Sequence, residues 1–383
     1  MHLPTLKLKR GREESMLRKH PWIFSGAVAS DYSKLNDGEV VKIVSADNNF
    51  IALAHYNYGR SIIAKILSFE EEEIDNLFFQ KRLSAALSLR KSFGIPSLQT
   101  NTFRLVNAEG DYLPGLVIDI YGDVAVIETQ STGMSLKLNH IASALDAIYP
   151  VSTIVYRAGD NVTLVKGDIK FVEVLENGHK FEVDLFNSQK TGFFIDQRDN
   201  RGILSGYVKG KDVLNCFSFT GGFSVYAFAG GANSVSSLDI SASALDLAQK
   251  NFLTNFPQSE EKHEIIQKDC FDYLASVENK FDLIILDPPA FAKKRESVKN
   301  ALSGYKKLNQ MGIKAVKKPG IVFTFSCSQL ISEVDFKQMI LGAVINSGES
   351  VQILKHLSAS SCHPINACHN EGGYLKGMIL KVG

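Results

Sequence analysis

The sequence predicts an α/β protein with a small β-rich domain (residues 1–73), an α+β middle domain (74–178) and a larger α/β domain (179–383). After residue 180, short apolar runs alternate with amphipathic helical segments, which is typical of a parallel sheet covered on both faces. Before residue 180, β-branched or alternating runs separated by turn signals predominate. The length of 383 residues also favours more than one domain.

Composition excludes several classes of protein. Apolar residues make up 45% and charged residues 22%, as in soluble globular proteins, and the net charge of +1 argues against a histone-like binder. No apolar run approaches the roughly 18 residues that span a bilayer, and the first residues lack the apolar core of a signal peptide. Five scattered cysteines form no disulfide framework. We therefore expect a cytoplasmic protein with free thiols and no membrane partner.

The first twenty residues carry a local excess of positive charge that the net charge conceals. Two acidic residues, Glu13 and Glu14, stand among six basic ones: Lys7, Lys9, Arg10, Arg12, Arg18 and Lys19. Such a run predicts a surface that attracts nucleic acid, and a merely solvated strand and helix is the alternative that the sequence leaves open.

The first two domains are predicted from short runs. Val40–Val44 and Ile62–Leu67 read as strands of the first domain, and apolar residues at helical spacing predict a helix over Ile74–Phe93. Gly94 and Pro96 end that helix. In the middle domain Leu136–Ile148 reads as a helix among five strands: Phe103–Asn107, Leu116–Ile120, Val124–Thr129, Ile154–Arg157 and Phe171–Glu176.

The third domain is predicted from strand–helix alternation. A helix is expected over Ala242–Phe256. The expected strands are Val213–Asn215, Ser234–Asp239, His263–Gln267, Leu283–Asp287 and Gly320–Ser326. Ligands of such sheets bind beyond the carboxyl ends of the strands, so the residues that follow each strand are the candidates for a site.

The loop after the first of these strands runs from Asn215 to Ser224 and contains Gly221 and Gly222. It lacks the G-x-G-x-x-G pattern of dinucleotide sites, and no G-x-x-x-x-G-K-[ST] occurs in the chain, which disfavours a pyrophosphate ligand. Glycines without a Cβ still let the backbone approach a ligand closely, although a turn alone also explains them.

Polar residues follow the other strands. Asp239 ends the second strand, where a carboxylate can accept hydrogen bonds from ribose hydroxyls, and Asp269 follows the third, within reach of an adenine amino group. Both could instead cap helices, a role for which Ser241 is also suited. Asp287 precedes two prolines that fix its turn, and Cys327 places a thiol after the fifth strand.

These features together resemble the class I S-adenosylmethionine-dependent methyltransferases, whose cofactor has a ribose and an adenine but no phosphate. The resemblance extends along the chain to the ribosomal RNA large-subunit methyltransferase I family, a group of cytosine-C5 RNA methyltransferases. It rests on Asp287-Pro288-Pro289, on Phe325-Ser326-Cys327-Ser328 and on four further segments: 18–26, typical of a PUA RNA-binding domain, 104–116, 189–198 and 373–377.

The resemblance implies a Rossmann-like methyltransferase domain after a PUA domain, with S-adenosylmethionine as cofactor and ribosomal RNA as substrate. Cys327 is implied as the nucleophile that adds to cytosine C6, with Asp287 at the base edge; burial as a small apolar residue is the alternative for Cys327. The predicted cofactor contacts are Asn215, Phe217, Thr220, Gly221, Gly222, Asp239, Ser241, Asp269 and Asp287.

Two other functions remain open from the sequence. Many cytosine-C5 RNA methyltransferases place a cysteine directly after the Asp-Pro-Pro turn, where this chain has Ala290, so a mechanism with two cysteines is in doubt. Methylation of an exocyclic base nitrogen favours an aromatic residue at that position, and Phe291 is one residue away. The third hypothesis is a non-catalytic RNA-binding assembly protein, and a homodimer is left open.

Several other residues have two interpretations. Arg198 and Arg201 could pair with a phosphate or the cofactor carboxylate, or form surface ion pairs with Asp196 or Asp199. Trp22 could stack on a base or pack in the core. Packing roles are expected for Cys216 and Cys270, and no metal is predicted because the zinc-ligand spacings are absent around Cys362, His363, Cys368 and His369.

Overall fold

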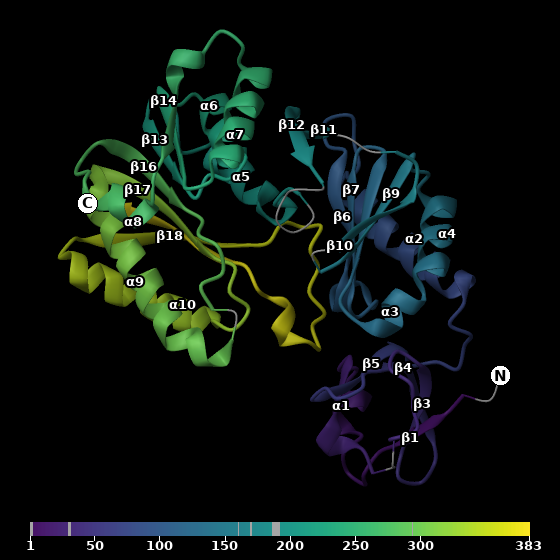
Figure 1. The fold of residues 1–383 in the computed structure, drawn as a ribbon. Helices are drawn as coiled ribbons and strands as arrows, with labels where there is room; N and C mark the ends of the chain where they lie inside the picture. Colours follow the sequence, from purple (N-terminus) through teal and green to yellow (C-terminus); the bar gives the residue numbers. More distant parts are fainter. Residues whose placement is uncertain (1–2, 30–31, 160, 169–170, 186–191, 293) are drawn as a thin grey trace. The chain divides into compact units, whose positions relative to one another are not determined.

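The computed structural model describes residues 3–29, 32–159, 161–168, 171–185, 192–292 and 294–383 (Figure 1). The chain folds into two compact units, each built from more than one stretch of sequence. The first unit comprises Met1–Val172, Asp184–Gly192 and Ser361–Gly372, and the second comprises Glu173–Val183, Phe193–Ser360 and Gly373–Gly383. The predicted boundaries at residues 73 and 178 stay predictions.

The first unit contains two five-stranded sheets. In the first sheet, of order β1-β3-β4-β5-β2, only the β1–β3 pair is parallel, and buried aliphatic side chains such as Leu6, Val41 and Ile63 form its core. Its elements are β1 (Thr5–Lys7), α1 (Glu14–Leu17), β2 (Trp22–Phe24), β3 (Val40–Val44), β4 (Phe50–Tyr56) and β5 (Ile62–Ser68).

The second sheet has the order β10-β9-β8-β7-β6 and packs against the long helix α2. Asp75 caps α2 by accepting a hydrogen bond from the backbone N–H of Phe78 at 3.0 Å. The elements are α2 (Asn76–Ser92), β6 (Thr102–Asn107), β7 (Leu116–Tyr121), β8 (Val124–Thr129), α3 (Thr132–Leu136), α4 (Leu138–Ile148), β9 (Thr153–Ala158) and β10 (Asn161–Lys166).

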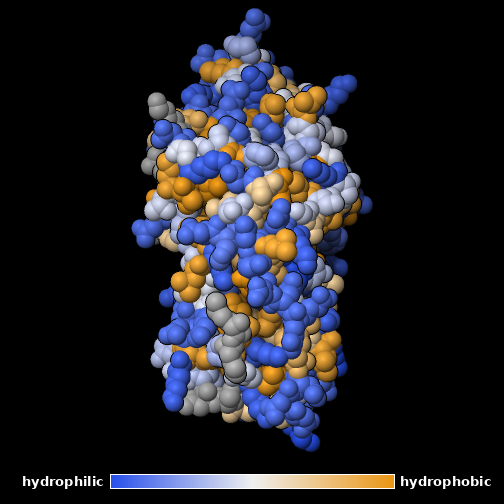
Figure 2. Space-filling model, turned by 90° about the vertical axis from the view of Figure 1, so that its right-hand side faces the viewer, coloured by the Kyte–Doolittle hydropathy of each residue, from blue (hydrophilic) through white to orange (hydrophobic). Residues whose placement is uncertain are grey.

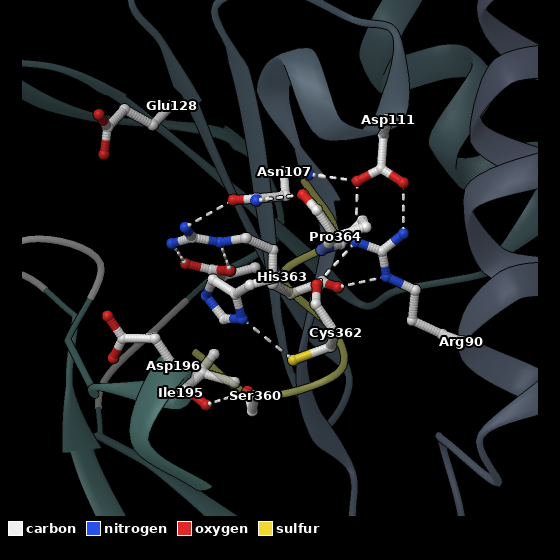
Figure 3. A network of polar contacts seen from close by, with 12 residues as sticks. Arg90, Asn107, Asp111, Glu128, Ile195, Asp196, Ser360, Cys362, His363 and Pro364 are labelled. Atoms are coloured by element: carbon white, nitrogen blue, oxygen red, sulfur yellow. Dashed lines mark hydrogen bonds and ion pairs between the residues drawn. The ribbon is translucent and has the colours of Figure 1, made fainter. Parts of the chain in front are cut away.

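Arg90 of α2 forms a buried ion pair with Asp111 and also hydrogen-bonds to the segment 361–372 of the same unit (Figure 3). Both terminal nitrogens of Arg90 donate to the carboxylate of Asp111, one of them at 2.8 Å, and Nη2 also donates to the carbonyl of Cys362 at 2.7 Å. Nearby, Nδ2 of Asn107 donates to the carbonyl of Pro364 at 2.9 Å. The guanidinium therefore holds together pieces of chain that lie 272 residues apart.

Gly110 lies where this segment approaches the backbone most closely. A Cβ at this position would lie 1.9 Å from the carbonyl oxygen of Pro364, which is an impossible distance. Only glycine therefore fits between Glu109 and Asp111 while the segment 361–372 keeps its place.

The second unit is built on a seven-stranded sheet of order β15-β14-β13-β16-β17-β19-β18. The strands β13 to β17 are parallel, and β19 is antiparallel to both of its neighbours. The strands are β13 (Asp212–Cys216), β14 (Ser234–Asp239), β15 (His263–Gln267), β16 (Phe281–Leu286), β17 (Val316–Ser326), β18 (Val351–Ser358) and β19 (Lys376–Val382).

Helices cover both faces of this sheet, as the apolar strands require (Figure 1). One face packs on α8, α9 and α10, through side chains such as Leu274, Tyr305 and Phe336, and the other packs on α5 and α6, through Leu204 and Phe223. The helices are α5 (Arg198–Leu204), α6 (Gly222–Ala229), α7 (Ala242–Asn255), α8 (Cys270–Ala275), α9 (Val298–Ala315) and α10 (Glu333–Ser347). A hairpin of β11 (Phe171–Glu176) and β12 (His179–Asp184) precedes them.

The sequence-based elements agree with this architecture, with two corrections. The third domain was predicted as a parallel sheet, but in the structure β19 lies between β17 and β18 and is antiparallel to both. The predicted helix Leu136–Ile148 is interrupted at Lys137, so that α3 ends at Leu136 and α4 begins at Leu138. The strands without a predicted counterpart include β2, β4, β10, β12, β18 and β19.

No helix in the described part of the chain is long and apolar enough to cross a membrane. The face in Figure 2 mixes hydrophilic residues with small hydrophobic areas, as the composition predicts.

We predict that Arg90→Met lowers the free energy of unfolding by about 3–5 kcal/mol, because it leaves the carboxylate of Asp111 buried without its partner. Urea unfolding followed by circular dichroism measures the effect. The matched control is Arg10→Met, which removes an ion pair with Asp47 on an 80% exposed side chain and should cost less than about 1 kcal/mol. Equal losses in the two variants would contradict a structural role for the buried pair.

Candidate active site and cofactor loop

The loop between β13 and α6 has an unusual backbone. Phe217 and Phe219 adopt positive φ angles of 57° and 47°, and Gly221 adopts 78° as it caps α6. Non-glycine residues in this region are strained, and such residues cluster at ligand sites. The loop lies at the carboxyl edge of the parallel strands, where the sequence predicted a cofactor.

Asp239 ties this loop to the end of β14. Its Oδ2 accepts a hydrogen bond from the backbone N–H of Phe219 at 2.9 Å, and its Oδ1 accepts from the N–H of Ser241 at 3.0 Å. Ser241 itself caps α7, because its Oγ accepts from the N–H of Ala244 at 3.3 Å. The helix-cap alternative therefore belongs to Ser241, while the carboxylate of Asp239 is half-buried against the strained loop.

Asn215 is 1% exposed at the end of β13. Its Nδ2 donates to Oγ of Ser224 at 2.9 Å, and that hydroxyl continues a buried chain through Ser237 to Nε2 of His263 at 2.8 Å. Burial lowers the pKa of His263 to about 4, so this imidazole is neutral at pH 7. Oδ1 of Asn215 is buried and has no hydrogen-bond partner among the described residues, which leaves this acceptor unsatisfied beside the loop.

The remaining predicted cofactor residues occupy different surroundings. Thr220 is buried, and its carbonyl accepts a hydrogen bond from Nδ2 of Asn251 at 3.0 Å. Gly222 opens α6, with the side chain of Arg201 3.3 Å from the place of a Cβ. Asp269 is exposed and caps α8 by accepting from the backbone N–H groups of Phe271 and Asp272. The helix-cap interpretation of Asp269 is thus present in the structure.

Asp287, half-buried directly after β16, is held by a glutamine. Nε2 of Gln197 donates to Oδ1 of Asp287 at 3.0 Å, and Oε1 of Gln197 accepts from Nδ2 of Asn200 at 2.6 Å. Gln197 and Asn200 are both buried. These two hydrogen bonds fix the orientation of the Asp287 carboxylate. Gln197 lies in the segment 189–198, which carried part of the family resemblance but had no predicted role for this residue.

Cys327 lies next to the turn that follows Asp287. Its thiol donates to the carbonyl of Pro288 at 3.8 Å, because the parallel strands β16 and β17 end side by side. The side chain is half-buried, so the sulfur is not sealed within the core. Behind it, the hydroxyl of Tyr305 lies 2.9 Å from Oγ of Ser328, and burial raises the pKa of Tyr305, which keeps this phenol neutral.

Arg201 forms a buried ion pair in place of the surface ion pair that was one of its two interpretations. Its Nε and Nη2 donate to the carboxylate of Glu176 at 2.8 and 2.7 Å, and both side chains are buried. The expected surface ion pair with Asp196 or Asp199 is wrong for Arg201, because the β11–β12 hairpin supplies a buried carboxylate that the sequence did not place nearby. Arg198 does pair with Asp199, at 3.0 Å.

Cys216, Cys270 and Trp22 pack against neighbouring side chains. Cys216 and Cys270 are buried, and burial together with Cys270 raises the pKa of the Cys216 thiol. Nε1 of Trp22 donates to Glu109 at 2.8 Å, and its ring lies 4.3 Å from that of His369. In the described ranges, no group of three potential ligands could hold a metal ion.

Known proteins resemble the chain along its whole length. A family model described as an S-adenosylmethionine-dependent methyltransferase matches residues 111–312, and one described as a PUA-like domain matches residues 6–69. Ribosomal RNA large subunit methyltransferase I of Alteromonas mediterranea is 37% identical over 390 residues, which cover 98% of both chains. The same protein of Pseudoalteromonas atlantica is 39% identical over 391 residues, again 98% of both chains.

A solved structure agrees with these relatives. A protein classed as a methyltransferase and crystallised in complex with SAH superimposes with a TM-score of 0.87 and 26% identity, covering 99% of this chain and all of the other. A second structure, a SAM-dependent methyltransferase from Streptococcus mutans by its description, has a TM-score of 0.86.

The fold and these comparisons define an S-adenosylmethionine-dependent methyltransferase with a PUA-like domain. More particularly, the chain belongs to the ribosomal RNA large subunit methyltransferase I family. Its cofactor is S-adenosylmethionine. The polar atoms at the carboxyl edge suit a ligand with ribose and amino groups, because Asp239 supplies a carboxylate and Asn215 an unpartnered acceptor.

We predict that Gly221→Ala destabilises the protein more than Gly210→Ala. Both glycines have positive φ angles, 78° and 69°, at which alanine costs about 1–2 kcal/mol. A Cβ at Gly221 would also lie 3.0 Å from Cβ of Ala248, whereas nothing lies within 4 Å of one at Gly210. Urea unfolding of both variants measures the loss in free energy of unfolding, and the difference between the two losses is the cost of the contact with Ala248. Equal losses would show that α7 moves to accommodate the new Cβ without cost.

Proposed function

We propose that this protein methylates C5 of a cytosine in large-subunit ribosomal RNA through a covalent adduct with Cys327. The observation that carries the proposal is the juxtaposition of a half-buried thiol with the Asp287-Pro288-Pro289 turn, 3.8 Å from sulfur to the Pro288 carbonyl oxygen. This pairing occurs at the carboxyl edge of the sheet, beside the loop that suits the cofactor.

Cytosine C5 is a poor nucleophile, so the chain must activate it. The Cys327 thiolate adds to C6, which forms an S–C6 bond and shifts electron density to C5. S-adenosylmethionine would supply the methyl group: as the C5–methyl bond forms, the bond between the methyl group and the sulfonium sulfur would break, and S-adenosylhomocysteine would leave with that electron pair. A base then removes the C5 proton, the electron pair returns to the ring, the S–C6 bond breaks, and the thiolate is regenerated.

Asp287 is proposed to hold the base edge of the cytosine. Gln197 occupies Oδ1 of its carboxylate and thereby fixes the direction of the other oxygen, Oδ2. A carboxylate in this position accepts a hydrogen bond from the amino group of cytosine, as acidic side chains do when they recognise this base. Asp287 is also the candidate for the base that takes the C5 proton.

The cofactor is proposed to contact the loop and strand ends predicted from the sequence. The carboxylate of Asp239 and the acceptor of Asn215 are the side chains with the clearest geometry for this. Backbone contacts are proposed for the loop positions, and the remaining residues complete the set: Phe217, Thr220, Gly221, Gly222, Ser241, Asp269 and Asp287.

Methylation of an exocyclic nitrogen is the alternative chemistry. It needs an aromatic side chain free to stack on the target base near the Asp-Pro-Pro turn. The ring of Phe291 instead packs 4.4 Å from that of Tyr305 and covers Gly304 of α9. Ala290 has no ring, so the side chains present favour attack at C5.

The basic N-terminal run is proposed to contact RNA. Two surface cavities of the first unit border it. Arg12, Arg18 and His20 line one, and Lys19 lines the other together with Lys81 and Arg82. Salt bridges of Arg10 with Asp47 and of Arg18 with Glu14 offset part of this charge. A substrate of ribosomal RNA also favours the cytoplasm as the place of the reaction.

We predict that Cys327→Ala lowers the methylation rate by at least about a thousand-fold, because the nucleophile is lost. Mass spectrometry of nucleosides from unmodified large-subunit RNA measures the product, which should be 5-methylcytidine. The control is Cys362→Ala, which removes a buried thiol of the segment 361–372 and should retain activity. A methylated exocyclic nitrogen, or full activity of Cys327→Ala, would refute the thiol mechanism.

We predict that Asp239→Asn weakens binding of S-adenosylmethionine by about 10- to 100-fold, as expected for loss of a charged hydrogen-bond acceptor. Calorimetric titration measures the affinity, with Asp246→Asn, an exposed position on α7, as the control. An unchanged affinity in Asp239→Asn would remove this residue from the proposed cofactor site.

A further inference from the structure

Lys376 is a buried lysine beside the proposed nucleophile. It begins β19 and pairs in register with Ser326, the residue that precedes Cys327. The side chain is 4% exposed, and its Nζ donates to the carbonyls of Ser328 at 2.8 Å and Tyr374 at 2.7 Å. Lys376 is thereby held to the residues on both sides of Cys327: its backbone pairs with Ser326, and its ammonium bonds to the carbonyl of Ser328.

The charge of this ammonium has no carboxylate partner within ion-pair distance in the described part of the chain; its hydrogen-bond acceptors are two neutral carbonyls. An ammonium in such a place is costly, and burial lowers the pKa of Lys376 to about 8. Negative charge on Cys327 and on Glu333 opposes this shift. At pH 7 the side chain therefore remains mainly protonated, as a cation that lacks a directly paired anion.

The surroundings of Cys327 need such a cation if its sulfur is to be an anion. The thiol hydrogen points at the carbonyl of Pro288, so loss of the proton leaves a negative sulfur near a negative oxygen. Asp287 from the end of β16 and Glu333 from α10 add negative charge to this region, and Tyr305 from α9 is a neutral phenol. None of these named groups carries a positive charge.

We propose that the ammonium of Lys376 stabilises the thiolate form of Cys327 and so acts as a positioning residue for the nucleophile. The inference rests on the proposed function, because it concerns the same sulfur. The thiol proton passes to solvent, Lys376 keeps its three protons, and the cation–anion attraction replaces the lost hydrogen bond to Pro288. The same attraction favours release of the sulfur as an anion when the S–C6 bond breaks.

The test is the pH dependence of Cys327 alkylation by iodoacetamide in the full-length protein without RNA, with the labelled peptide identified by mass spectrometry. Only the thiolate reacts, so the midpoint of the rate profile reports the pKa of the thiol. In the unsubstituted protein we expect the midpoint of Cys327 to lie at least about one pH unit below that of the exposed Cys368. A midpoint equal to or above that of Cys368 overturns the proposal without any variant.

The variants are Lys376→Met, which keeps the length of the side chain but removes the charge, and Lys376→Arg, which retains it. We expect Lys376→Met to raise the Cys327 midpoint by about one pH unit or more and to lower its labelling rate at pH 7 by about tenfold. In Lys376→Arg, both the midpoint and the labelling rate should stay close to those of the unsubstituted protein. The labelling rate of Cys368 should stay constant. A Lys376→Met protein that binds S-adenosylmethionine normally and shows no shift contradicts the proposal.

The two failures are distinguishable. If Cys327→Ala retains methylation, the proposed function is wrong, whatever the midpoint of the thiol. If Cys327→Ala abolishes methylation but Lys376→Met leaves the midpoint unchanged, the nucleophile stands and the role of Lys376 is lost. A purely structural role of Lys376 in joining β19 to Ser328 would alter stability without moving the midpoint.

Discussion

The parallel pairing of β16 with β17 is the constraint on which the rest of the site depends. Leu286 pairs with Thr324, so both strands deliver their following residues to the same edge of the sheet. A carboxylate and a thiol that lie forty positions apart, Asp287 and Cys327, thereby become neighbours. Insertion of β19 antiparallel to β17 then brings Lys376, at the start of β19, to the same edge.

Buried polar contacts hold the side chains of this edge in fixed directions. Gln197 orients Asp287, and Asp239 joins the strained loop at Phe219 to the start of α7. Such groups are costly to bury unless each is hydrogen-bonded, so a satisfied network specifies one arrangement and disfavours others. The acceptor of Asn215 that lacks a partner among the described residues is consistent with a place left for a ligand.

Family membership and the chemistry of the site answer different questions. The relatives place the chain in the ribosomal RNA large subunit methyltransferase I family, and the family model describes an S-adenosylmethionine-dependent methyltransferase. The atom that receives the methyl group depends on which side chains face the base. Here the thiol of Cys327 lies beside the Asp-Pro-Pro turn, and the ring of Phe291 packs against that of Tyr305. Position 290, an alanine, limits the proposed mechanism to one cysteine.

The sequence by itself determined the class of fold, the strand ends that carry Asp239, Asp287 and Cys327, and the family, because apolar periodicity and local motifs are properties of contiguous residues. Only the tertiary structure decided which distant groups meet: Arg201 with Glu176, and Lys376 with the backbone around Cys327. Neither pair has a local signal, since each joins separate strands or helices through burial. An ion pair or a perturbed lysine therefore follows from packing and cannot be read from spacing along the chain.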